Sequence, residues 1–240
     1  MALPKPPPEW AHDEITTFFD VARNNKYATF ANFQDEIRRT IDIDTAYRKV
    51  IDGLNHAKDW FVGFFILRAH SNFLAACGLC WSGQIPECYA ILRSCLENAL
   101  YGLYLARNPN SRETWLRRHD SDDHKKKVKD EFKIGTMMNL AESIDKKEGE
   151  VAKLLYERTI DYGAHPNELA LMQTLQINEK AEHVEFKIIY LDDNPNQLKL
   201  AMKTTAQVGV CALSLFRSVY RERFDILGAT NAIDHIKKGL

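Results

Sequence analysis

The feature that most constrains this chain is a pair of apolar segments within residues 57–107, joined by the short sequence Ser82-Gly83-Gln84. The first segment, WFVGFFILRAHSNFLAACGLCW, is apolar on nearly every face of a helix, and the second, PECYAILRSCLENALYGLYLAR, carries one wide apolar stripe. A helix that is hydrophobic all round belongs in the centre of a globular protein. We therefore expect a helical hairpin over residues 57–107, with the remaining helices packed around it.

Apolar residues recur at helical spacing through most of the remaining chain, which predicts a mostly α protein built as an up-and-down helical bundle. The pattern predicts helices over residues 13–23, 30–54, 148–164 and 194–225, the second of them broken at the IDID sequence with Asp44 as a cap. Alternation in residues 184–190 predicts a minor β-hairpin near residues 175–191. We expect the proline-containing residues 1–12 to form an extended arm and residues 13–240 a single helical domain.

Charge and apolar run length set limits on the partners and the compartment. The formal net charge of −1 gives no global attraction to nucleic acid or anionic membranes. The longest apolar run, residues 60–67, is far shorter than the roughly 20 residues that span a bilayer. We expect a cytoplasmic protein without a membrane partner. The sequence contains no GxGxxG, Walker, HExxH or GxSxG motif, so we expect no cofactor.

The cysteines raise the question of a metal site, because Cys77 and Cys80 form a CxxC pair and His70, Cys88 and Cys95 are near in sequence. Zinc sites usually pair two such motifs from loops or turns. These cysteines fall inside apolar helices, where cysteine behaves as a small core residue. We expect core packing and no metal, with metal binding and redox chemistry as the alternatives.

Polar residues on faces that should be buried are the most informative positions. Arg93 and Glu97 flank the apolar stripe of the second segment. At about 100° per residue, Arg158, Tyr162 and His165 fall on the inward stripe of the helix predicted over residues 148–164, and Asp161 lies at its edge. Two interpretations stay open. The charged groups either bond to one another as a structural network, or they line a polar pocket in which His165 exchanges a proton.

The segment of residues 107–129 carries eight Lys or Arg against four acidic residues. Such a run indicates a solvated helix face, and the alternative is a contact surface for a phosphate backbone. Trp115 is the only aromatic residue among these charges, so the sequence does not predict a platform on which bases stack.

The sequence RTIDYGAHPN of residues 158–167 resembles the R-x(4–6)-H signature of the HEPN superfamily of all-helical nucleotide-binding and RNase-like proteins. Together with RSCLENALYGLYLARNP, it also resembles a group of uncharacterised bacterial helical proteins. The resemblance implies that Arg158 stabilises phosphate charge and His165 acts as acid and base, with the two groups meeting across a dimer interface and cleaving RNA without metal. The binding residues expected beside them are Arg93, Glu97, Asp161, Tyr162 and Asn167.

Two functions therefore stand as hypotheses. The first is a HEPN-like protein that binds RNA or a nucleotide, with metal-independent RNase activity in defence or stress response. The alternative is a non-catalytic helical interaction protein that forms a homodimer and in which the Arg/Glu network is structural.

Overall fold

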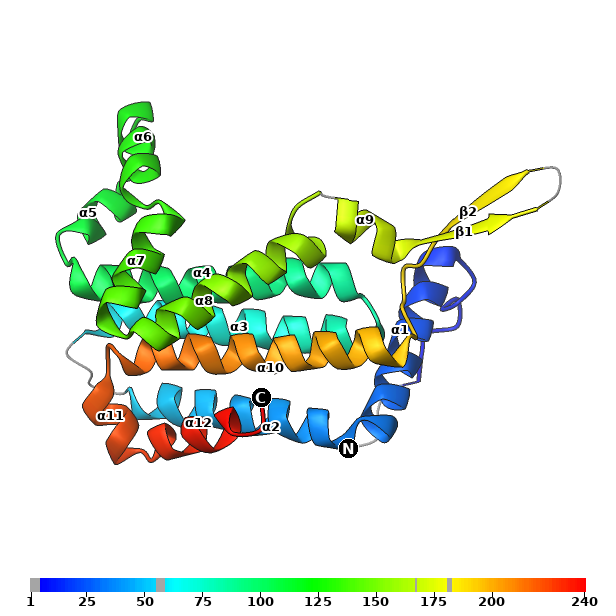
Figure 1. Ribbon diagram of the computed structural model, residues 1–240, viewed down its shortest axis with the longest axis horizontal. Coiled ribbons are helices and arrows are strands. Elements are labelled where there is room, and N and C mark those ends of the chain that lie inside the picture. Colours follow the sequence, from blue (N-terminus) through cyan, green and yellow to red (C-terminus); the bar gives the residue numbers. More distant parts are fainter. Residues whose placement is uncertain (1–4, 55–58, 167, 181–182) are drawn as a thin grey trace.

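The computed structural model describes residues 5–54, 59–166, 168–180 and 183–240, and its architecture confirms the predicted mostly α fold with a minor β-hairpin (Figure 1). Most of the long helices lie roughly alongside one another, and the first helix of the chain runs across one end of the bundle. The elements are α1 Glu14–Asn32, α2 Gln34–Gly53, α3 Trp60–Ser82, α4 Ile85–Arg107, α5 Ser111–Leu116, α6 Asp122–Glu131, α7 Ile134–Ile144, α8 Lys146–Thr159, η1 Ile160–Ala164, α9 Glu168–Thr174, β1 Leu175–Glu179, β2 Val184–Ile188, α10 Pro195–Arg217, α11 Arg221–Ile226 and α12 Ala229–Lys237.

The predicted central hairpin is present as α3 and α4, and its turn depends on one glycine. Gly83 has φ 88°, which is the left-handed conformation that ends a helix at low cost only for glycine. A Cβ on Gly83 would also lie 2.9 Å from the backbone nitrogen of Asp192. The Asp192 N–H donates to the Gly83 carbonyl at 2.8 Å. This contact fixes the segment that leads into α10 against the tip of the hairpin.

One apolar cluster fills the bundle and draws residues from α2 through α12. Its largest fully buried side chains are Tyr47, Tyr89, Phe73, Phe216 and Phe224. Tyr47 of α2 stacks on Phe73 of α3 at a centroid distance of 5.8 Å. Helix α10 packs against both α3 and α4, so it closes the core over the central hairpin.

The break between the first two helices lies at Phe33, and the predicted break at residues 41–44 is wrong. Asp44 does not cap a helix. Its carboxylate accepts from Arg48 Nε at 2.8 Å and lies 2.6 Å from His70 Nε2 of α3. A mid-helix acid therefore serves as a link to the central helix, and the local sequence pattern does not distinguish this role from capping.

The predicted extended arm is also different in its described part. The Trp10 N–H donates to the Pro7 carbonyl, which forms a turn, and Trp10 Nε1 donates to Asp20 Oδ1 of α1 at 2.6 Å. Residues 7–11 thus fold back on α1, because a half-buried polar partner for the indole outweighs the extended preference of the prolines.

The predicted helix over residues 194–225 ends early. Helix α10 ends at Arg217, and the chain bends before α11 begins at Arg221. At this bend the Tyr220 hydroxyl donates to the carbonyl of Asp59, which precedes α3. The hydrogen bond joins the end of α10 to the start of the central hairpin.

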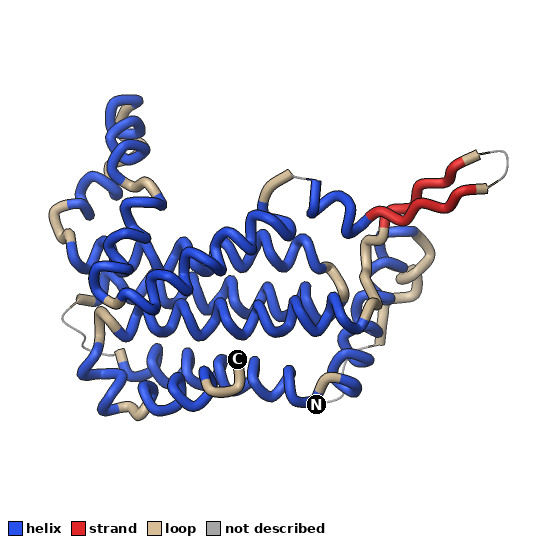
Figure 2. Tube along the Cα trace, viewed as in Figure 1, coloured by secondary structure: helices blue, strands red, loops and turns tan. Residues whose placement is uncertain are grey.

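The predicted hairpin is confirmed, with β1 and β2 antiparallel and Ile177 opposite Phe186 (Figure 2). It extends away from the bundle. The register places Leu175, Ile177, Val184, Phe186 and Ile188 on one face, and four of these side chains are exposed. This face has no cover from the described part of the chain.

Candidate functional site

The first group of predicted site residues is a cluster between α4 and α8. Arg93 Nε donates to Glu97 Oε1 at 2.9 Å, and the Tyr156 hydroxyl donates to the same oxygen at 3.1 Å. The Arg93 guanidinium lies 5.0 Å from the centroid of the Tyr156 ring. Burial and the charge of Glu97 raise the pKa of Tyr156 to about 12. Each polar group thus has a partner within the chain, and the cluster connects two helices.

Arg158 belongs to a second, separate cluster. Its Nη1 donates to Gln207 Oε1 of α10 at 2.8 Å and to Thr204 Oγ1 at 3.3 Å. The hypothesis of one network joining Arg93, Glu97, Arg158 and Asp161 is therefore wrong. The partners of Arg158 are the neutral side chains of Gln207 and Thr204, both on α10.

The neutral partners of Arg158 set the expected cost of its removal. Arg158→Ala should lower the free energy of unfolding by about 1–2 kcal/mol, because it removes two hydrogen bonds and strands no carboxylate. The measurement is urea denaturation followed by circular dichroism. The control is Arg38→Ala, because Arg38 is an exposed arginine of α2. A loss above about 4 kcal/mol would contradict this assignment, since it would indicate an unpaired buried charge.

His165 and Asp161 are exposed, so the prediction that His165 lies on the inward stripe is wrong. The reason is that the helix does not continue regularly after Thr159. The segment η1 contains a kink at Gly163, whose φ of 160° and ψ of −19° are not helical. The chain therefore changes direction before His165, and constant helical spacing no longer gives the side on which His165 lies. His165 itself is extended, with φ −141° and ψ 142°.

Tyr162 stays half-buried, and its ring lies 5.3 Å from that of Tyr89 on α4. Gly163 explains why this turn can approach α4 so closely. A Cβ at Gly163 would lie 2.6 Å from Pro86 Cα. Asn167, the last predicted binding residue, lies outside the described residues.

His165 borders a cavity of about 600 Å³ between the start of α4, η1, α9 and β2. The lining also contains Glu87, Glu168 and Tyr190, and the rest is mainly apolar. Among the described lining residues there is no lysine or arginine. Arg158 is not among them either. Within one chain, the two residues of the expected RNase pair therefore do not share a cavity.

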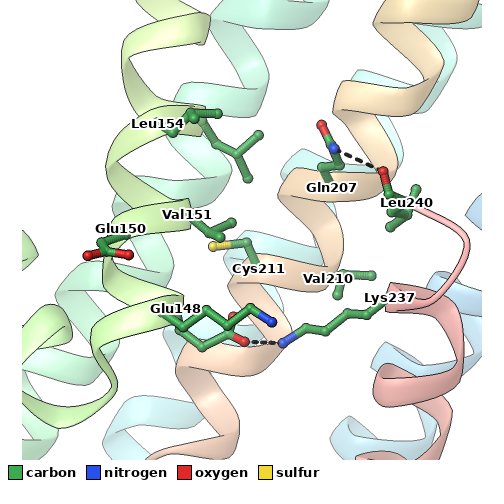
Figure 3. Close-up of a pocket in the computed structure, with 11 residues that line it drawn as sticks. Glu148, Glu150, Val151, Leu154, Gln207, Val210, Cys211, Lys237 and Leu240 are labelled. Carbon is green, nitrogen blue, oxygen red and sulfur yellow. Dashed lines mark hydrogen bonds and ion pairs between the residues drawn. The ribbon is translucent and has the colours of Figure 1, made fainter.

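A second cavity, of about 460 Å³, was not predicted (Figure 3). Val151 and Leu154 of α8, Val210 and Cys211 of α10, and Leu240 give it an apolar lining. At its edge Lys237 forms an ion pair with Glu148, which joins α12 to α8. Its residues come from three distant parts of the chain, so no local motif could have indicated it.

The cysteines pack in the core, as predicted. All five are free and buried. The Cys95 thiol donates to the Ala69 carbonyl at 3.3 Å, and burial raises the pKa of Cys77 well above its usual value. Such thiols are poor nucleophiles. Within the described residues no group of three or more His, Cys, Asp or Glu side chains could hold a metal ion.

The basic segment forms α5 and α6, and the lysines of α6 are exposed, as expected of a solvated face. Trp115 packs on Phe61 and Phe65 of α3, at centroid distances of 6.0 and 5.4 Å. It is therefore part of the core packing and is not available as a stacking platform.

One face of α3 is only partly covered by the surrounding helices. Trp60 is 65% exposed, and Phe64, Leu67 and Leu74 are 57%, 49% and 41% exposed. Ser71 lies between Leu67 and Leu74 on the same side of the helix, and Gly78 follows Leu74. We call these six residues the α3 stripe. The expectation that other helices surround this segment is thus wrong for one face.

Helix α3 is also the one helix in the described chain that is long and apolar enough to cross a membrane, by length and composition. Half of its most apolar window is buried inside the bundle. Its buried face packs on α4 and α10, so the helix as a whole is part of the protein core.

Comparisons with known proteins add no assignment: no family model matches the sequence, and no curated protein or solved structure matches it significantly.

Proposed function

We propose that this chain is a non-catalytic helical interaction protein that works as a homodimer through the α3 stripe. The observation that carries the proposal is the line of four large exposed apolar side chains on the central helix, Trp60, Phe64, Leu67 and Leu74. Isolated exposed apolar residues are common, whereas a contiguous patch bordered by polar residues is typical of an interaction surface.

The polar clusters support a structural interpretation of the predicted site residues. Arg93 and Glu97 bind each other and Tyr156, and Arg158 binds Gln207. These contacts hold α8 against α4 and α10. Such intramolecular partners are what a structural role for these charged groups predicts.

The exposed apolar area of the stripe supplies a large part of what a stable dimer needs. Trp60 and Phe64 are aromatic, and an aromatic side chain presents about 150–250 Å² when it is fully exposed. Together with the partly exposed Leu67 and Leu74, they supply roughly 400 Å² of apolar surface per copy. A symmetric contact would bury that area twice, which is roughly 800 Å², and neighbouring residues must add about 400 Å² to reach the about 1,200 Å² of a specific interface.

The proposal is tested by placing a charge in the stripe. Phe64→Glu should weaken self-association by at least about 30-fold, which corresponds to about 2 kcal/mol, because the carboxylate loses water in the contact. The measurement is the dissociation constant from sedimentation equilibrium. Phe19→Glu is the matched control, because Phe19 is a 52% exposed phenylalanine on α1, outside the stripe.

Two results would contradict the proposal. In the first, Phe64→Glu leaves the dissociation constant of the dimer unchanged and Phe19→Glu raises it. The dimer contact would then lie on α1. In the second, the wild-type chain binds phospholipid vesicles, Phe64→Glu abolishes this binding, and the wild-type chain does not self-associate when no vesicles are present. The stripe would then contact a membrane. Circular dichroism spectra check that both variants keep their helical fold.

A second candidate function is binding of RNA or a nucleotide, with Arg158 and His165 in the roles implied by the HEPN resemblance. The observation that favours it is the exposed position of His165 at the mouth of the 600 Å³ cavity. An accessible imidazole can contact a substrate that enters the cavity. If a dimer brings Arg158 of one copy to His165 of the other, the pair would supply both phosphate stabilisation and acid–base chemistry.

This candidate predicts a specific loss. His165→Ala should lower the cleavage rate of a single-stranded RNA by at least about 100-fold, the usual contribution of a general acid or base. His235→Ala is the matched control, since His235 is an exposed histidine of α12 that does not line the cavity. Absence of cleavage by the wild-type protein, or equal rates for wild type and His165→Ala, would exclude the catalytic role.

A further inference from the structure

The α3 stripe has the spacing of a coiled-coil seam. Its members are Trp60, Phe64, Leu67, Ser71, Leu74 and Gly78, which are separated alternately by four and three residues. Two helices with this 3.5-residue repeat can pack along their length with the seam buried. The first three members are large. Two of the last three, Ser71 and Gly78, are small.

From this distribution we infer that two copies of the chain pack α3 against α3 in antiparallel orientation, with the twofold axis at the level of Ala69. The inference rests on the proposed homodimer and specifies its geometry. In this register Trp60 lies opposite Gly78 of the second copy, and Leu67 lies opposite Ser71. Phe64 lies opposite Leu74. Each large residue meets a small one, except in the Phe64–Leu74 pair.

The seam fills evenly only in this orientation. The seam of a coiled coil alternates between two kinds of position, and in an antiparallel coiled coil each kind faces the other. All three pairs follow this rule about the same twofold axis. Parallel packing would place Trp60 on Trp60 and Gly78 on Gly78. One end would then be crowded and the other would leave a void, and both conditions are destabilising.

Glycine at position 78 supports the same conclusion. A Cβ there would meet only Lys26 Nζ, at 3.8 Å, so the chain itself does not require glycine at this position. Glycine inside a helix costs about 1 kcal/mol relative to alanine. Gly63, which lies beside the stripe, has open space where its Cβ would be. An indole seated on Gly78 would benefit from the missing side chain.

The charges near the seam are consistent with this contact. Arg68 is the only charged residue of α3, and it lies beside the stripe, where its long side chain reaches solvent. The residues of the stripe themselves carry no charge. Lys26 of α1 lies beside Gly78, so its ammonium would sit near the face of the incoming Trp60 indole, a favourable cation–π arrangement.

The register is tested with two single-cysteine substitutions, Leu67→Cys and Ser71→Cys, on chains with different affinity tags. Both positions are exposed, and the native cysteines are buried. In the antiparallel register these two positions face each other within the Cα separation of about 4.4–6.8 Å that a disulfide needs. Mixing the two chains under mild oxidation should give a cross-linked heterodimer carrying both tags. Either chain alone should stay uncrosslinked. Position 67 of one copy lies four residues along the helix axis from position 67 of the second copy, and the same holds for position 71.

The outcomes separate the inference from the proposed function. Cross-linking of either variant with itself would indicate parallel packing and overturn the register. A chain that sediments as a dimer but forms no heterodimer disulfide would place the interface elsewhere and also overturn it. A chain that stays monomeric would contradict the homodimer proposal itself. As a second readout, Gly78→Leu should abolish dimerisation by blocking Trp60, while Gly78→Ala should be tolerated better.

Discussion

Replacement of Phe73 by alanine should lower the free energy of unfolding by about 3–5 kcal/mol, the usual cost of emptying a buried aromatic site. Phe73 is 0% exposed and stacks on Tyr47, and its ring lies against the backbone of Gly209 on α10. Three helices therefore meet at this ring. Because each of them is held by other contacts, the surrounding side chains cannot fill the cavity fully.

The measurement is urea denaturation at one fixed protein concentration, because association adds to apparent stability. Phe19→Ala on α1 is the matched control, since it removes the same side chain from an exposed site and should change the free energy by less than about 1 kcal/mol. Equal losses for the two variants would show that α3 does not form the centre of the core.

Replacement of Gly149 by alanine should lower the free energy of unfolding by about 1–3 kcal/mol, the usual cost of overpacking. Gly149 is buried in the first turn of α8 against α7. A Cβ there would lie 2.5 Å from Glu142 N and 2.7 Å from Glu142 Cβ, and it would also collide with Glu142 Cα. The backbone of α7 cannot rotate away as a side chain can, so the two helices must separate.

Gly135→Ala on α7 is the matched control. Its Cβ would meet nothing within 4 Å, so alanine should be neutral or stabilise the protein by up to about 1 kcal/mol. The predicted changes in the free energy of unfolding have opposite signs for the two variants, and one set of urea denaturation curves measures both. Stabilisation by both substitutions would contradict the close contact between α7 and α8.

Much of the fold follows from local patterns in the sequence. The apolar pair around Gly83 predicts the α3–α4 hairpin, and the alternation of residues 184–190 predicts the β-hairpin. The helix boundaries were less predictable. The break at Phe33 has no strong local signal, whereas the IDID sequence gives a misleading one, because Asp44 binds His70 from another helix.

The candidate site was less predictable than the fold. Helical periodicity places His165 inward only while the helix stays regular, and the kink at Gly163 within η1 ends that condition. Arg158 was correctly expected to find a partner, but the partner, Gln207, lies 49 residues away on a helix whose rotation no local pattern determines. Contacts between distant segments decide which polar groups meet.

The α3 stripe could not be separated from the core by sequence. Phe64 and Phe65 are adjacent, and one is exposed while the other is buried. Both faces of α3 are apolar, so composition does not show which of them the bundle covers. A face that stays apolar without cover is itself the indication of a partner, but it becomes visible only in the folded arrangement.

The most direct test of the account is the mass of the wild-type chain in solution, measured by sedimentation equilibrium over a range of concentrations. If the α3 stripe is a homodimer interface, the mass at concentrations on the order of 10 µM should be twice the 27.6 kDa of one chain and should fall toward 27.6 kDa on dilution. A mass that stays at 27.6 kDa across the whole range would contradict the account.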